Sequence, residues 1–146
     1  MRYEGPIYRP PSEADSLLIQ ATVGCPHNKC TFCMVYKKGP PYKVRPLDEI
    51  CEDIREASDS YGNNVRSLFF PAGNTIAMPT EDLSAVCRFA AEAFPRLQRI
   101  TVYVKKPEWT ARKSRDEWPK WLFLWKKPVR TNDVRWREHG VLHFTE

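Results

Sequence analysis

The chain has 146 residues, of which 42% are hydrophobic and 28% are charged, with a formal net charge of +5. This length suits one ordinary domain and excludes a complete (β/α)₈ barrel, which takes about 250 residues. No apolar run approaches the roughly 20 residues of a membrane-spanning helix, and residues 1–6 lack the apolar segment of a secretory signal. We therefore expect a globular cytoplasmic protein, whose reducing surroundings argue against a disulfide framework for the five cysteines.

Charge and tryptophan content divide the chain near residue 104. Residues 1–104 contain 12 basic and 12 acidic residues, which gives a net charge of zero. Residues 105–146 contain 11 basic and 6 acidic residues, which gives a net charge of +5. All five tryptophans lie in the second part, at Trp109, Trp118, Trp121, Trp125 and Trp136. We expect an extended, proline-rich leader over 1–16, an α/β domain over 17–104 and an irregular, basic, Trp-rich tail over 105–146.

The predicted elements of the middle region alternate between strands and helices. The apolar run 17–23 predicts a first strand, and residues 46–61 predict a helix because Pro46 suits a first turn and Gly62 a helix end. A second strand is expected over 65–70, and a second helix over 79–94 with Thr80 as its N-cap. A third strand follows over 99–104. This β-α-β-α-β order predicts right-handed crossovers and a parallel sheet.

Each predicted helix has one apolar face, set by residues three or four positions apart. On the first helix we expect the buried face to comprise Leu47, Ile50, Cys51, Ile54, Ala57 and Tyr61. On the second helix we expect it to comprise Leu83, Val86, Cys87, Ala90 and Phe94. Cys51 and Cys87 are therefore interpreted as small buried hydrophobic residues and are left out of the candidate site.

Two long loops follow the first two predicted strands, over 24–45 and 71–78. The carboxyl ends of parallel strands meet at one edge of a sheet, which is where such sheets bind ligands. The sequence therefore predicts that both loops face a common site. Four basic residues lie in the first loop, and we interpret them as a solvated run that also offsets negative charge at the site: Lys37, Lys38, Lys43 and Arg45.

The first loop concentrates three cysteines, Cys25, Cys30 and Cys33, within nine residues. Three thiolates bind one face of a [4Fe–4S] cube and leave a fourth iron open to a small molecule. The alternative is a Cys₃His zinc site with His27 as the fourth ligand. His27 lies inside the first chelate loop, where tetrahedral closure is strained, and no second CxxC pair exists, so the ligand pattern favours iron and sulfide over zinc.

The cysteine loop resembles that of radical S-adenosylmethionine enzymes, whose common pattern is CxxxCxΦC with an aromatic residue at Φ. Phe32 matches the aromatic position, and the run GCPHNKCTFC followed by Met-Val-Tyr-Lys is similar to an uncharacterised bacterial subset of that family. The resemblance covers about residues 3–103. It departs from the common pattern in two places: four residues separate Cys25 from Cys30 instead of three, and the segment 71–74 lacks the glutamate of the family's second motif.

The resemblance implies a partial (β/α) barrel of about three parallel strands with two crossover helices. It implies that Cys25, Cys30 and Cys33 hold a [4Fe–4S] cluster whose open iron binds S-adenosylmethionine, and that cleavage of this cofactor gives a 5′-deoxyadenosyl radical. Four residues are implied in binding the cofactor: Phe32, Ala72, Gly73 and Asn74. The implied partners are S-adenosylmethionine, an unknown substrate and an electron donor such as flavodoxin or ferredoxin. We expect no association of the protein with a membrane.

The tail does not continue this pattern. Prolines at 107, 119 and 128 interrupt any long helix, and no strand–helix alternation is visible. The strand–helix pattern of the first 104 residues stops abruptly, which favours a shifted reading frame over an appended basic segment. A frameshifted tail is expected to be poorly ordered. Interleaved basic and tryptophan residues offer a rival function, a zinc-containing nucleic-acid-binding module. The zero net charge of residues 1–104 and the lack of a nucleic-acid-binding motif argue against it.

Overall fold

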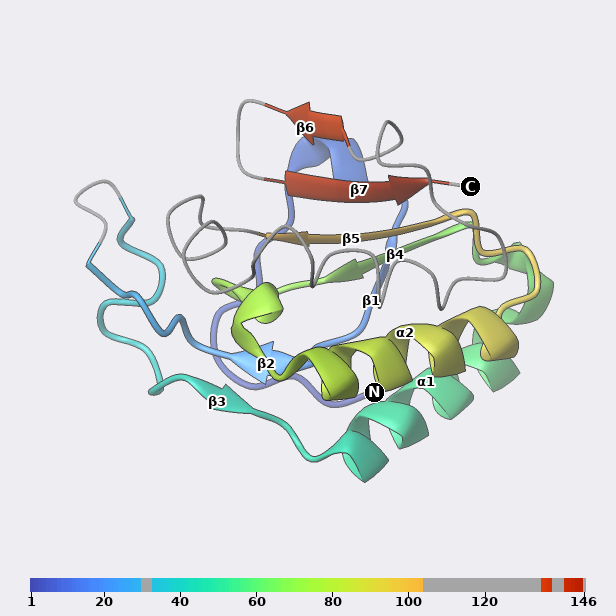
Figure 1. The fold of residues 1–146 in the computed structure, drawn as a ribbon, viewed down its shortest axis with the longest axis horizontal. Coiled ribbons are helices and arrows are strands. Elements are labelled where there is room, and N and C mark those ends of the chain that lie inside the picture. The colour runs from blue at the N-terminus through green and yellow to red at the C-terminus, as the bar shows by residue number, and fades with distance from the viewer. Residues whose placement is uncertain (30–32, 104–134, 138–140, 146) are drawn as a thin grey trace.

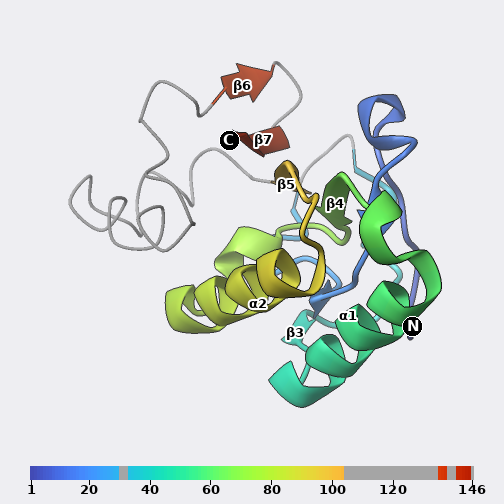
Figure 2. The same cartoon turned by 90° about the vertical axis from the view of Figure 1, so that its right-hand side faces the viewer.

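The computed structural model describes residues 1–29, 33–103, 135–137 and 141–145 (Figure 1). Three strands of its main sheet are parallel: β1 (Leu17–Leu18), β4 (Ser67–Phe70) and β5 (Arg99–Tyr103). Two helices connect them, α1 (Leu47–Tyr61) and α2 (Thr80–Ala93), and Figure 2 shows both on one face of the sheet. The predicted β-α-β-α-β order and the parallel pairing are therefore confirmed.

The first predicted strand is divided in two. β1 pairs with β4, and the chain then leaves the sheet, so that β2 (Thr22–Val23) pairs antiparallel with β3 (Lys43–Val44). The backbone N–H of Arg45 also donates to Ala21 O at 3.0 Å. A single strand over 17–23 was thus the wrong prediction, because the returning end of the 24–45 loop supplies a partner that no local pattern reveals.

Both helices begin and end close to the predicted residues. Pro46 and Pro79 are the N-caps, with φ of −53° and −52°, so that Thr80 is the first helical residue and not the N-cap that the sequence predicts. Proline fixes φ near the helical value and donates no N–H, which suits it to a helix start. Gly62 ends α1 with a φ of +51°, a conformation that glycine adopts at little steric cost.

The core lies between the two helices and the sheet. Side chains of Leu68, Phe70, Ile100 and Val102 are buried against the helices. Four helical residues with the predicted spacing pack onto them: Ile50, Ile54, Val86 and Ala90. One prediction for α1 is wrong, because Tyr61 is 48% exposed. Asp53, which is not part of the predicted apolar face, is also buried. Leu47, Cys51 and Cys87 are partly buried.

The leader is less uniform than predicted, because it contains the short 3₁₀ helix η1 (Pro11–Glu13). Glu13 is fully buried, where its Oε2 accepts hydrogen bonds from the hydroxyls of Ser16 at 2.6 Å and Thr101 at 2.9 Å. The guanidinium of Arg99 lies 3.4 Å from the same oxygen. A buried carboxylate is tolerated when it is paired and hydrogen-bonded in this way. The Glu13 carboxylate therefore anchors the leader to β5.

The outer edge of β1 has no strand beside it among the described residues. Backbone carbonyls at alternate residues of β1 and its flanks accept hydrogen bonds from side chains instead: Ser16 O from Arg9 Nη1 at 3.1 Å, Leu18 O from Tyr3 at 2.9 Å and Gln20 O from Arg45 Nη1 at 2.7 Å. Unpaired strand edges invite pairing with other chains unless they are covered. These three side chains satisfy the edge without a strand.

The opposite edge of the parallel sheet is paired. β7 (Val141–Thr145) runs antiparallel to β5, and β6 (Arg135–Arg137) pairs with β7, which gives the strand order β1-β4-β5-β7-β6. Over these two segments the backbone is extended and paired, and not irregular as the sequence suggests, because the edge of β5 offers free ladder groups. The rest of the predicted tail lies outside the described residues, and so do its first four tryptophans. Among the residues described, neither helix has the length and apolar character that crossing a bilayer requires.

Candidate functional site

The two loops that were predicted to share a site are in contact. The N–H of Gly73, in the loop after β4, donates to the carbonyl of Gly24, in the loop after β2, at 3.1 Å. Beneath this bond, the hydroxyls of Thr22 and Thr75 lie 3.3 Å apart and both side chains are buried. The start of the cysteine loop is thus fixed against residues 71–75 at the carboxyl ends of the strands, where an α/β sheet binds its ligands.

Gly73 makes the closest approach between the loops. A Cβ atom added at Gly73 would lie 2.4 Å from Cys25 Cβ and 3.0 Å from Cys25 Sγ, closer than real Cβ atoms come to one another. Only glycine therefore fits beside Cys25. The lack of a side chain at Gly73 lets Cys25 pack directly against the main chain of the second loop.

Of the two residues that flank Gly73, Ala72 has an unusual backbone conformation. Ala72 has a φ of +91° although it carries a Cβ, and it is only 1% exposed. Asn74 is fully buried, and its carbonyl accepts the N–H of Ala77 at 3.0 Å, at the start of η3 (Thr75–Ala77). Positive φ at a residue other than glycine costs on the order of 1 kcal/mol or more and is concentrated at functional sites. Ala72 is therefore held in a strained backbone conformation by its surroundings.

Two of the three predicted metal ligands are described. Cys25 and Cys33 are free thiols and partly exposed, whereas Cys30 and Phe32 lie outside the described residues. The described residues alone contain no group of three or more potential metal ligands, as expected when the middle cysteine is left out. A pair of partly exposed thiols on a loop, one of them beside bare backbone, fits a thiolate-ligated cluster. His27, the alternative zinc ligand, is also partly exposed.

Tyr36 is a residue of this site that the sequence analysis did not single out. It is 7% exposed, and its Cδ2 lies 3.1 Å from the position of a Cβ at Gly73. Burial raises the pKa of its phenol far above the usual value, and the neighbouring Tyr103, Cys33 and Cys25 raise it further. The phenol is therefore neutral at physiological pH. An aromatic residue in an irregular loop gives no periodic signal, so the burial of Tyr36 could not be predicted.

The basic run of the first loop is only partly solvated. Lys37 and Lys38 are exposed, and Lys43 pairs with Glu4 at 2.8 Å on the surface. Arg45, in contrast, is 5% exposed, and its Nη1 lies 2.8 Å from Oδ2 of Asp53. The interpretation of Arg45 as a solvated residue was therefore wrong, because its partner on α1 could not be identified from the loop sequence. Arg45 fixes the far end of the cysteine loop to the helix.

Cys51 lies on α1 and Cys87 on α2, and neither belongs to the two loops. Burial raises the pKa of Cys87 to about 12, and burial also raises the pKa of Cys51. At pH 8 the thiolate fraction of Cys87 is then about 10⁻⁴, against roughly a quarter for an unfolded cysteine.

We therefore expect iodoacetamide at pH 8 to modify Cys87 far more slowly in the folded protein than in the chain unfolded by guanidinium. Peptide mass spectrometry over time measures both rates at this one residue. Equal rates in the two states would contradict the raised pKa of this thiol. A Cys87→Ser variant identifies the labelled peptide.

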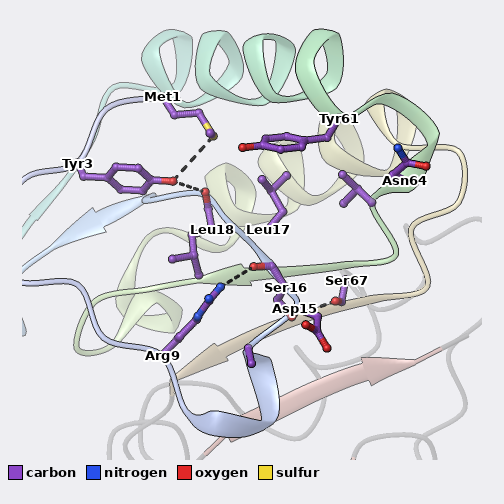
Figure 3. A pocket seen from close by; sticks show the side chains of 12 residues that line it. Met1, Tyr3, Arg9, Asp15, Ser16, Leu17, Leu18, Tyr61, Asn64 and Ser67 are labelled. Carbon is purple, nitrogen blue, oxygen red and sulfur yellow. Dashed lines mark hydrogen bonds between the residues drawn. The ribbon is translucent and has the colours of Figure 1, made fainter.

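A pocket of about 390 Å³ lies elsewhere, at the amino ends of β1 and β4 (Figure 3). Leu17 and Leu18 of β1 line it together with Ser67 of β4, and Tyr3 and Tyr61 reach toward each other across it. It contains none of the predicted site residues, and it lies at the opposite end of the strands from residues 71–74. We therefore place the candidate site at the two loops and not in this pocket.

Comparison with known proteins does not assign the chain to a family. No family model, no curated protein and no solved structure matches the chain.

Proposed function

We propose that residues 17–103 form the cofactor-binding part of a radical S-adenosylmethionine enzyme. Cys25, Cys30 and Cys33 would bind a [4Fe–4S] cluster, with S-adenosylmethionine at its open iron and an electron donor such as flavodoxin or ferredoxin as partner. The observation that supports this most directly is the contact of Cys25 with the bare backbone of Gly73. It joins the cysteine loop to the second loop that the resemblance implicates.

In this proposal each part of the site has a separate task. A cluster bound here supplies the electron that cleaves the sulfonium C–S bond of S-adenosylmethionine. The thiolates would bind the metal, and main-chain carbonyl groups of residues 71–74 would accept hydrogen bonds from the amino group of the cofactor. These main-chain oxygens would replace the missing glutamate of the family's second motif. Phe32 would pack near the adenine.

Anaerobic reconstitution with iron and sulfide tests the proposal. We expect about four irons and four sulfides per chain and a brown protein with thiolate-to-iron charge-transfer absorption. Replacing Cys25, Cys30 or Cys33 by Ala should abolish this binding, because each is a ligand. Replacing Cys51 or Cys87 by Ala should not, which makes these two variants the matched controls.

One outcome would overturn the proposal directly. Binding of one zinc per chain without sulfide would identify the alternative site with His27 as a ligand. Retention of iron in the Cys30→Ala variant together with its loss in Cys51→Ala would show that the ligand set is wrong.

A further inference from the structure

We infer that Tyr36 is a positioning residue of the cysteine site, whose ring seats the cysteine loop on residues 71–74 and so sets the placement of Cys25 and Cys33. The inference rests on the proposed function, because it assigns Tyr36 a role toward the metal ligands. It goes beyond that proposal by adding a residue outside the cysteine motif.

The burial of Tyr36 is unusual for its segment. Met34 is 71% exposed, and Lys37 and Lys38 are exposed, yet the ring of Tyr36 turns inward and is 7% exposed. The carbonyl of Tyr36 accepts the N–H of Gly39 at 3.2 Å, which closes a turn directly after it. An inward aromatic ring next to a closed turn fixes the segment that carries Cys33.

The ring and Cys25 meet at the same glycine. Measured from the position of a Cβ at Gly73, Tyr36 Cδ2 lies at 3.1 Å and Cys25 Sγ at 3.0 Å. Cys25 and the ring of Tyr36 therefore fill the space that a side chain at Gly73 would occupy. Because Tyr36 follows Cys33 by three residues, its ring holds the segment after Cys33 beside the same glycine that Cys25 contacts.

The chemistry of the phenol suits this place. A tyrosine side chain is uncharged, so it adds no negative charge beside cysteines that would bind a metal as thiolates. Groups that orient metal ligands without binding the metal commonly change metal affinity by about 10- to 100-fold when they are removed. We expect the ring, more than the hydroxyl, to produce this effect, because the ring makes the described contact.

Iron affinity of the reconstituted full chain, measured by competition with a chelator, tests the role. The Tyr36→Leu and Tyr36→Met variants should bind iron at least about 10-fold more weakly than the unmodified chain. Tyr36→Phe should bind within about twofold, since it keeps the ring. Met is unbranched and close in length, so that it provides a folded variant if Leu does not fold.

A second core variant separates positioning from general destabilisation. Phe94 is 1% exposed and packs in the helix–sheet core, away from both loops, so Phe94→Leu should lower the melting temperature without a comparable loss of iron affinity. Equal loss of affinity in Phe94→Leu and Tyr36→Met would overturn the inference and leave the proposed function standing. Unchanged iron affinity in both Tyr36→Leu and Tyr36→Met would also overturn the inference and leave the proposed function standing. An unmodified chain that binds no iron would overturn both.

Discussion

Replacing Gly73 by Ala is expected to destabilise the protein by about 3 kcal/mol and to abolish iron binding. The new Cβ would lie 2.4 Å from Cys25 Cβ, and this contact can be relieved only by moving the cysteine backbone or the 71–74 loop. Gly73 has an ordinary φ, so the effect is one of space and not of backbone conformation. Chemical denaturation of the apoprotein measures the loss of stability, and the iron content after reconstitution measures the loss of iron binding.

Gly39→Ala is the matched control for this change. Gly39 lies in the same cysteine loop, also has an ordinary φ, and a Cβ there would meet nothing closer than 3.6 Å. We expect its stability and iron content to stay near those of the unmodified chain. If Gly73→Ala behaved like Gly39→Ala, the two loops would not be in the contact on which the candidate site depends.

Replacing Asp53 by Ala is expected to cost about 3–5 kcal/mol, because it leaves the buried guanidinium of Arg45 without its nearest carboxylate. The side chains of Asp53 and Arg45 are 2% and 5% exposed, and their closest atoms are 2.8 Å apart. Asp53 Oδ1 also accepts the backbone N–H of Arg2 at 3.1 Å, so the leader loses a contact as well. A loss of this size is a large fraction of the 5–15 kcal/mol that typically stabilises a domain.

Two further variants test whether the unpaired charge of Arg45 causes the loss of stability in Asp53→Ala. Lys43→Met removes an ion pair whose two side chains are about half exposed, and we expect it to change stability by at most about 1 kcal/mol. The double variant Asp53→Leu with Arg45→Met removes both buried charges and should recover much of the loss. A double variant no more stable than Asp53→Ala would show that the uncompensated charge is not the source. Urea denaturation curves provide all of these free energies of unfolding.

The regular elements could be predicted because their signals are local. α1, α2 and β5 begin and end within one residue of the predicted bounds, since proline, glycine and the spacing of apolar residues mark them along the chain. Three features depend on pairings that no local pattern marks: the division of the first strand into β1 and β2, the burial of Arg45 and the burial of Asp53. The first requires the pairing of β2 with β3, and the other two require each other.

In the candidate site, too, some features could be predicted from local patterns and others could not. Cys25 and the loop that contains Gly73 could be placed at one edge of the sheet, because the carboxyl ends of parallel strands meet there. The close approach of Gly73 to Cys25 and the inward ring of Tyr36 could not be predicted, because both depend on how two loops without periodicity fold onto each other. The predicted roles of Cys30 and Phe32 remain predictions, since these residues lie outside the described part of the chain.

The central claim is that three cysteines of one loop hold a cluster with an open iron beside the backbone of residues 71–74. Electron paramagnetic resonance of the reduced, reconstituted chain, recorded with and without S-adenosylmethionine, tests it most directly. We predict the signal of a reduced [4Fe–4S] cluster whose g values shift when S-adenosylmethionine is added, because the cofactor binds the iron that lacks a cysteine. A spectrum that S-adenosylmethionine leaves unchanged, or a chain that takes up zinc and gives no signal, would contradict the account.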